Sequence, residues 1–268
     1  MFISWARIVM TDTPSVPENR PQILACPDGA TIAYHHLAGR PPTVVFLGGY
    51  ASDMTGSKAT FLEASCRASG QAFLRFDYRG HGASSGAFSD GTIGLWAGDA
   101  VTAIEAATDG PLVLVGSSMG GWIMLLAALA LKPRVAGLIG IAAAPDFTED
   151  LMWDEFDLKQ RAALERDGVL DMPSDYDDEP YTVTMALIED GREHLVLREP
   201  IPLTCPVRLL HGLEDKDVPW TVSMRLAEAI KSEDVTVTLV KGAGHRLSEP
   251  EDLARLERVV AELCGVTS

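Results

Sequence analysis

The strongest chemical signal in the sequence is a serine framed by small residues. Residues 116–121 read Gly-Ser-Ser-Met-Gly-Gly, which fits G-x-S-x-G with Ser118 at the centre. A buried apolar run, 112–115, leads into this motif, and an apolar helical pattern, 122–131, leads out of it. A strand–turn–helix of this kind is typical of a nucleophile elbow, in which a sharp turn exposes the serine hydroxyl. We predict that Ser118 is a nucleophile; Ser117 and a plain glycine-rich turn are the alternatives.

A serine hydroxyl needs a base within hydrogen-bond reach, and that base needs an orienting acid. His245 follows the last predicted strand in a glycine-rich loop, Lys-Gly-Ala-Gly-His-Arg, that can bring it to the serine. Asp215 lies in the segment His-Gly-Leu-Glu-Asp-Lys-Asp-Val-Pro, directly after another predicted strand. We predict that His245 is the base and Asp215 the acid, with Asp217 and Glu214 as rival acids.

Acyl transfer also requires two amide donors for the negative charge that develops on the carbonyl oxygen. The amide of Met119 lies at the start of the helix that follows the serine and supplies one donor. The second should come from the loop after strand 43–47, which begins Gly48-Gly49-Tyr50. We predict that the amide of Tyr50 is this second donor.

Alternating strand and helix patterns must position these residues. Short β-branched and apolar runs alternate with longer segments of helical periodicity, which predicts an α/β fold with a mostly parallel central sheet and helices on both faces. The expected strands are 31–35, 43–47, 72–76, 112–115, 135–141, 207–210 and 235–240, and the main expected helices are 58–69, 93–107, 121–131, 221–230 and 250–263.

The domain organisation follows from one interruption of this rhythm. Residues 146–202 show no buried strand, are rich in acidic side chains and read as a small helical cap inserted into a core of 23–145 and 203–268. Residues 1–22 read as a flexible lead-in. The alternative for the insertion is a solvated excursion without a role in the chemistry. Because ligands bind at the carboxyl ends of strands in open α/β sheets, a cap here would cover the site.

Aromatic residues near the predicted elbow and in the predicted cap could form an acyl pocket. Trp122 follows the serine motif, and Trp153 and Phe156 lie in the cap segment. We predict that these three side chains, together with Tyr50, bind the substrate.

Several short segments carry a resemblance to a known family. They are Gly49-Tyr50, Met54-Thr55-Gly56, Arg75-Phe76-Asp77-Tyr78, the run from Val115 to Trp122, Arg208-Leu209-Leu210-His211-Gly212, Val218-Pro219-Trp220 and His245-Arg246. With the ordered set of serine, aspartate and histidine, the chain resembles the α/β-hydrolase superfamily. Within it, the chain resembles the mitochondrial members that act as palmitoyl-protein thioesterases and acyl-glucuronide esterases. Gly48 departs from the His-Gly that many members have in this loop.

The resemblance implies hydrolysis of carboxylic esters or thioesters through an acyl-enzyme on Ser118. Dehalogenases and epoxide hydrolases of this fold carry aspartate at the elbow, so Ser118 argues against both. Two alternatives remain open from the sequence. One is perhydrolysis of the haloperoxidase type, and the other is a hydrolase-fold protein that binds without catalysis.

Composition limits the partners. The formal net charge of -16 disfavours binding to nucleic acid or an anionic membrane. The four cysteines are widely spaced without C-x-x-C, so neither a zinc site nor a redox motif is indicated. No other pattern in the sequence implies a metal or an organic cofactor. The expected partner is a small-molecule or acyl-protein substrate, and no apolar run is long enough to span a membrane.

The start of the chain bears on localisation. It lacks an Arg-rich, acid-poor presequence, and Met10 is an alternative start to Met1. We therefore expect a cytoplasmic protein, a bacterial or cytosolic relative of the mitochondrial enzymes.

Overall fold

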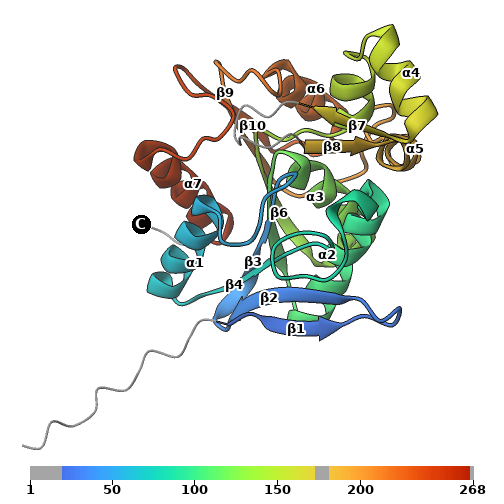
Figure 1. Cartoon of the computed structure of the whole chain (residues 1–268). Helices are drawn as coiled ribbons and strands as arrows, with labels where there is room; N and C mark the ends of the chain where they lie inside the picture. Colours follow the sequence, from blue (N-terminus) through green and yellow to red (C-terminus); the bar gives the residue numbers. More distant parts are fainter. Residues whose placement is uncertain (1–19, 173–180, 266–268) are drawn as a thin grey trace, which may run out of the picture.

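A central eight-stranded sheet organises the computed structural model, which describes residues 20–172 and 181–265 (Figure 1). The strand order is β1-β2-β4-β3-β5-β6-β9-β10. β1 and β2 pair antiparallel to their neighbours, and all the other pairs are parallel. The strands are β1 (Gln22–Ala25), β2 (Thr31–Leu37), β3 (Arg40–Leu47), β4 (Gln71–Phe76), β5 (Leu112–Ser117), β6 (Val135–Ile141), β9 (Val207–Gly212) and β10 (Val235–Val240).

Helices cover both faces of this sheet. In Figure 1, α1 and α7 lie on one side, and α2 and α3 lie on the other. The helices of the core are α1 (Ser57–Ser69), α2 (Ile93–Ala107), α3 (Met119–Ala130), α6 (Thr221–Ala229) and α7 (Pro250–Leu263), with short turns η1 (Phe88–Asp90) and η2 (Lys132–Arg134). The predicted mostly parallel sheet with helices on both faces is confirmed.

Successive side chains of the central strands pack alternately into two hydrophobic cores, one on each face of the sheet. On β3, Val45 and Leu47 pack into the core under α2 and α3, whereas Val44 and Phe46 pack into the core under α1 and α7. This follows from the period of two in a strand. A strand buried on both faces reads as a continuous apolar run, which is why β5 was evident from the sequence.

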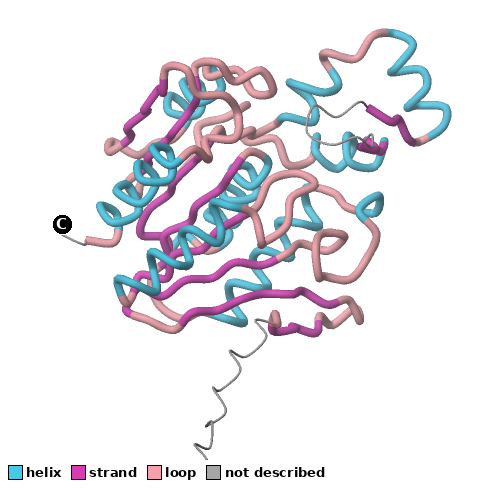
Figure 2. Tube along the Cα trace, turned by 60° about the vertical axis from the view of Figure 1, so that its left-hand side comes forward, coloured by secondary structure: helices cyan, strands magenta, loops and turns pink. Residues whose placement is uncertain are grey.

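The segment between β6 and β9 forms a projection at one end of the sheet (Figure 2). It contains the π-helical turn η3 (Thr148–Trp153), helices α4 (Leu158–Asp167) and α5 (Met185–Arg192), and an antiparallel pair of strands, β7 (Val169–Met172) and β8 (Tyr181–Thr184). The segment predicted as a helical cap thus contains helices and, in addition, a short pair of strands. Both strands are four residues long and partly exposed, so they lack the buried apolar run that a sequence pattern can detect.

This segment has its own small hydrophobic core, and hydrogen bonds join its two ends where it meets the rest of the structure. Four buried side chains, Phe156, Leu164, Val183 and Ile188, make the core. At the base, the fully buried carboxylate of Asp146 accepts hydrogen bonds from the amides of Val196, at 2.8 Å, and Leu197, at 2.9 Å. Burial raises the pKa of Asp146, while these amides and Arg198 act in the opposite direction. One side chain thus joins the start of the segment to its end.

Two further expectations concern the start of the chain and the presence of a membrane-spanning helix. The predicted lead-in 1–22 falls mainly on residues 1–19, which lie outside the described residues, and Gln22 begins β1. Among the helices of 20–172 and 181–265, none has the length and apolar character needed to cross a membrane.

Candidate active site

The turn between β5 and α3 holds Ser118 in a conformation that L residues rarely adopt. Its φ is 54° and its ψ is -122°. The small neighbours make this turn possible, because a Cβ on Gly116 would lie 2.3 Å from the carbonyl oxygen of Gly120. A Cβ on Gly120 would lie 2.1 Å from the carbonyl oxygen of Leu47. Strain of this kind is concentrated at functional sites, and here it presents the serine above the sheet edge.

Three side chains predicted from the sequence lie in hydrogen-bond contact. The hydroxyl of Ser118 lies 3.0 Å from Nε2 of His245, and Nδ1 of His245 lies 2.8 Å from Oδ2 of Asp215. Ser118 comes from the end of β5, Asp215 from the loop after β9, and His245 from the loop after β10. The parallel strands end at the same sheet edge, so residues 127 and 30 positions apart meet there.

The carboxylate of Asp215 is fully buried and has four hydrogen-bond donors. Oδ1 accepts from the amides of Asp217, at 3.0 Å, and Val218, at 2.9 Å. Oδ2 accepts from His245 and lies 3.1 Å from Nε2 of His211. Burial alone would raise the pKa of Asp215, but the hydrogen bonds from His211, His245 and Val218 outweigh it and hold the pKa well below its usual range. The group therefore stays ionised at neutral pH.

His211 is a contact of Asp215 that the sequence did not reveal. It is fully buried on β9, and its Nε2 faces two acceptors, the carboxylate of Asp215 and the carbonyl oxygen of Val218 at 2.9 Å. Nε2 must therefore carry the proton. Nδ1 lies 2.7 Å from the hydroxyl of Ser223, which fixes the ring from its other side. His211 stands in the His-Gly motif of the sequence, but nothing in the motif gives the direction of its ring.

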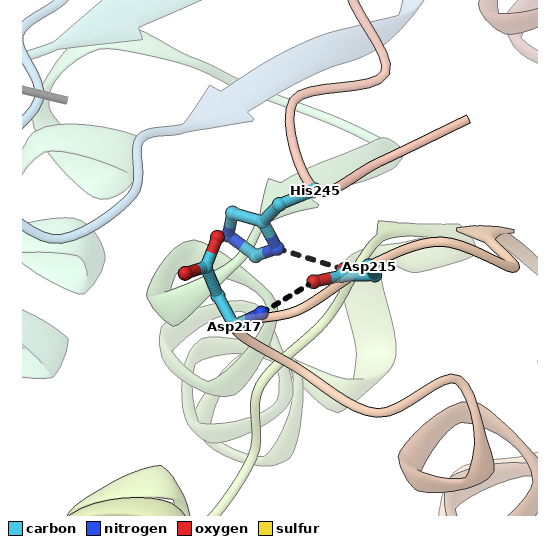
Figure 3. A group of neighbouring side chains, drawn as sticks. All are labelled: Asp215, Asp217 and His245. Atoms are coloured by element: carbon cyan, nitrogen blue, oxygen red, sulfur yellow. Dashed lines mark hydrogen bonds and ion pairs between the residues drawn. The ribbon is translucent and has the colours of Figure 1, made fainter. Parts of the chain in front are cut away.

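Figure 3 shows Asp217 beside Asp215 and His245, with its side chain next to the ring of His245. One donor atom from each of Asp215, Asp217 and His245 lies within 4.8 Å of the others, a spacing that a metal ion could use. The lone pairs of Asp215 are directed at N–H groups, however, and His245 donates Nδ1–H to Asp215. A cation would have to break this hydrogen bond, so the cluster fits a proton-transfer network better than a metal site.

The residues of the two predicted amide donors, Met119 and Tyr50, line the same cavity as Ser118. Met119 is the first residue of α3, and the first amides of a helix have no acceptor within it. The loop containing Tyr50 approaches from the end of β3, because a Cβ on Gly49 would lie 3.4 Å from Cβ of Ser118. The hydroxyl of Tyr50 donates to the carbonyl of Thr182, 3.1 Å away, which ties this loop to strand β8.

A cavity of 1180 Å³ opens beside Ser118. Ser118, Met119, Tyr50 and His245 all line it. Apolar side chains gather along part of its wall: Tyr50, Phe88, Phe147, Leu151, Met152 and Tyr181. The rings of Phe88, Phe147 and Tyr181 contact Tyr50 edge-on, with centroids 4.8, 6.0 and 6.0 Å away. This volume and lining can hold a long apolar chain next to the serine.

The predicted acyl-pocket residues of the helix and cap do not line this cavity, and that expectation is corrected. Trp122 is fully buried, with its indole N–H donating to the carbonyl of His194 at 3.0 Å. Trp153 lies under the guanidinium groups of Arg161 and Arg192, with 5.2 and 4.6 Å between each Cζ and the ring centroid.

Phe156 belongs to the small core of the cap segment. The aromatic positions were apparent from the sequence, but their directions depend on packing within that segment. Only Tyr50, of the four residues expected in the pocket, contributes to its wall.

A serine in a tight strand-to-helix turn at the edge of a parallel sheet, with an acid and a histidine in the loops after later strands, is the arrangement typical of α/β-hydrolases. Residues 44–256 match the alpha/beta hydrolase family, and the chain belongs to this family. The fold prediction and the predicted resemblance are thus confirmed.

Individual relatives narrow the comparison. The human palmitoyl-protein thioesterase ABHD10, mitochondrial, is 41% identical over 238 residues, which cover 88% of this chain and 78% of the relative. The structure of alpha/beta hydrolase domain-containing protein 10 from mouse superposes with a TM-score of 0.86 at 38% identity, covering 92% of this chain and 99% of the mouse chain. A hydrolase from Agrobacterium vitis S4 superposes with the same TM-score, 0.86, at 40% identity, covering 90% and 96% of the two chains. The predicted class, an ester-hydrolysing enzyme, is supported by these relationships.

The prediction of a cytoplasmic protein is contradicted by the same comparison. The relatives from Homo sapiens, Pongo abelii and Bos taurus are all named as mitochondrial. The expectation depended on the residue types at the start of the chain, and the compartment of a protein is not encoded in the residues that build its fold and site.

Proposed function

We propose that this protein is a serine hydrolase that cleaves acyl thioesters or esters through an acyl-enzyme on Ser118. The observation that carries the proposal is the continuous chain of hydrogen bonds from Ser118 through His245 to Asp215, at 3.0 and 2.8 Å. Asp217 and Glu214, the rival acids, are both exposed, whereas Asp215 is buried and bonded to His245.

The proposed mechanism assigns each group one task. His245, held by Asp215, accepts the proton of the Ser118 hydroxyl as its oxygen attacks the acyl carbonyl. The amides of Met119 and Tyr50 donate to the oxyanion. The bond to the leaving oxygen or sulfur breaks, and His245 returns the proton to that atom. Water then attacks the acyl-enzyme with His245 again as base, which releases the carboxylic acid and restores Ser118.

The cavity indicates the acyl group. Its wall of aromatic and aliphatic side chains favours a fatty acyl chain, because each methylene removed from water contributes about 0.8 kcal/mol. The relationship to palmitoyl-protein thioesterase ABHD10 supports the same substrate class. We therefore propose long-chain acyl thioesters as the preferred substrates and include acyl-glucuronide esters as a second group to be tested.

A substrate panel tests this proposal. Purified protein would be assayed on p-nitrophenyl esters from acetyl to palmitoyl, on a palmitoyl thioester and on an acyl-glucuronide. We expect kcat/KM to rise with chain length and to fall by several orders of magnitude in Ser118→Ala. A clear preference for acetyl esters would discard the fatty acyl substrate while leaving the triad intact.

Labelling with a fluorophosphonate probe tests the nucleophile separately. Ser117→Ala is the matched control, because Ser117 also lines the cavity but ends strand β5 in place of occupying the elbow. We expect labelling of the wild type and of Ser117→Ala, and no labelling of Ser118→Ala. Labelling that survives in Ser118→Ala would contradict the assignment.

A further inference from the structure

Lys58 is a charged residue in the cavity wall that the proposed mechanism does not use. It is the second residue of α1, and it is half-buried. Its ammonium donates to the carbonyl oxygen of Arg246, the residue directly after His245. Lys58 and Arg246 both line the cavity, so the cavity that contains the proposed base also has two cationic residues in its wall.

Three features of the structure disfavour a positive charge on Lys58. Burial and the neighbouring charge of Arg246 lower the pKa of Lys58 to about 8, with Asp252 acting in the opposite direction. The residue also lies in the first turn of a helix, where the peptide dipoles favour anions, and this turn contains no acidic residue. Lysine is therefore an unfavourable choice here for stability alone.

In the part of the chain that the structure describes, the ammonium of Lys58 forms no salt bridge, and Asp252 acts on it only from beyond ion-pair distance. Two carboxylates line the same cavity. Asp53 accepts from the amide and hydroxyl of Thr55, and Asp217 lies beside the ring of His245. An ammonium has three N–H donors, so one bond to a carbonyl leaves two for a ligand.

The chemistry of the proposed reaction decides which part of a substrate meets Lys58. His245 must protonate the leaving oxygen or sulfur, so the leaving group departs on the side of the cavity that His245 lines. Arg246 and Ser248 from the same loop also line the cavity, and Lys58 is bonded to that loop, so we expect Lys58 on the leaving-group side. The aromatic wall around Tyr50 is left for the acyl chain. The two parts of the substrate thus face walls of different chemistry.

We propose that Lys58 is a specificity-determining residue that binds an anionic oxygen group, such as a carboxylate, on the alcohol or thiol leaving group of the substrate. This inference rests on the proposed function, because it uses His245 to orient the substrate. It goes further by selecting among esters and thioesters those whose leaving group carries negative charge.

Three thioesters with one acyl chain and leaving groups of different charge test the proposal. They are the octanoyl thioesters of 3-mercaptopropionate, which is anionic, of 3-mercaptopropionamide, which is neutral, and of thiocholine, which is cationic and has no nucleophilic nitrogen to which the acyl group could migrate. Release of thiol would be followed with a disulfide reagent. We expect the wild type to have its highest kcat/KM on the anionic thioester, mainly through a lower KM.

Replacing Lys58 isolates its charge. Lys58→Met should lower kcat/KM roughly tenfold on the anionic thioester and change it less than twofold on the neutral one, since a charge-assisted hydrogen bond in a partly hydrated site is lost. Lys58→Arg should keep the preference. Lys159→Met, which removes an exposed lysine from α4, should leave all three rates unchanged. The preference of the wild type should also decline above a pH of about 8, where Lys58 loses its proton.

Other outcomes would overturn the inference. An equal loss on the anionic and neutral thioesters in Lys58→Met would mean that the residue only holds the His245 loop. A wild type that prefers the neutral or cationic thioester, or that hydrolyses none of the three, would also contradict it. Failure of the proposed function would be seen independently, as hydrolysis or fluorophosphonate labelling that survives in Ser118→Ala.

Discussion

Replacing Asp215 by asparagine keeps the shape of the side chain but removes its charge and one acceptor. In the structure both carboxylate oxygens face N–H groups: two backbone amides at Oδ1 and two imidazoles at Oδ2. The NH2 group of asparagine must therefore face donors whichever way the amide is turned. Backbone amides cannot change their role, whereas an imidazole can move its proton to the other nitrogen.

This asymmetry predicts the outcome. If the NH2 group faced the backbone, the amides of Asp217 and Val218 would lose their acceptor, which costs about 1–3 kcal/mol for each buried donor. We expect it to face the imidazoles instead, so that His245 becomes an acceptor at Nδ1 and carries its proton on Nε2. That tautomer cannot accept the proton of Ser118, and turnover should fall by about four orders of magnitude at neutral pH. The loss corresponds to about 5 kcal/mol of transition-state stabilisation.

Two measurements check the Asp215→Asn prediction. Hydrolysis of a p-nitrophenyl ester gives the loss of turnover, with Glu214→Gln, an exposed neighbour in the same loop, as the matched control. Urea unfolding should show a loss of about 1–3 kcal/mol at pH 7. The folded-state pKa of Asp215 lies below the unfolded value, so its stabilisation is present at neutral pH and disappears as the pH falls through the folded value. Turnover within tenfold of the wild type would refute the reasoning.

Three further predictions follow from the packing. Met152→Ala should lower kcat/KM about tenfold on palmitoyl esters and little on acetyl esters, because Met152 lines the cavity. An equal loss of kcat/KM on palmitoyl esters in Trp153→Ala would contradict this prediction. Gly120→Ala should reduce Tm sharply and abolish fluorophosphonate labelling, whereas Gly98→Ala, with open space at its Cβ on α2, should stabilise by about 0.5–1 kcal/mol. A Tm that is higher for Gly120→Ala than for Gly98→Ala would contradict this prediction. Burial lowers the pKa of His81, so the folded protein should lose stability as the pH falls from about 7 to 5. In His81→Leu the urea midpoint of unfolding should depend less on pH over that range. A pH dependence equal to that of the wild type would show that His81 is not the cause.

The central sheet and the elbow could be predicted from the sequence because their determinants are local. The apolar run of β5 and the small residues around Ser118 specify a strand, a tight turn and a helix within a few positions. Parallel strands then bring later loops to the same edge, so chain order alone brought Asp215 and His245 to the serine. The sequence could not specify which of the flanking carboxylates would be buried there.

The substrate-facing side chains could not be predicted in the same way. Trp153 and Met152 are neighbours, yet Met152 lines the cavity while Trp153 lies under two arginines. The difference depends on the π-helical turn η3 and on how α4 and α5 pack over it. Likewise, β7 and β8 form a pair only through contacts with each other, and neither strand is apolar enough to be evident alone. Such information is distributed over the whole segment.

The buried carboxylate of Asp146 has a consequence for how this molecule can be altered. It closes a ring between positions 146 and 196–197, so that the two ends of the intervening stretch lie side by side. We expect that the length and composition of this stretch can change without displacing the strands that precede Ser118 and Asp215. Exchange of residues 147–195 for the corresponding stretch of a relative should transfer substrate preference as a cassette. Asp146, Val196 and Leu197 lie outside the exchanged range, so the hydrogen bonds that join its two ends are retained in the exchange.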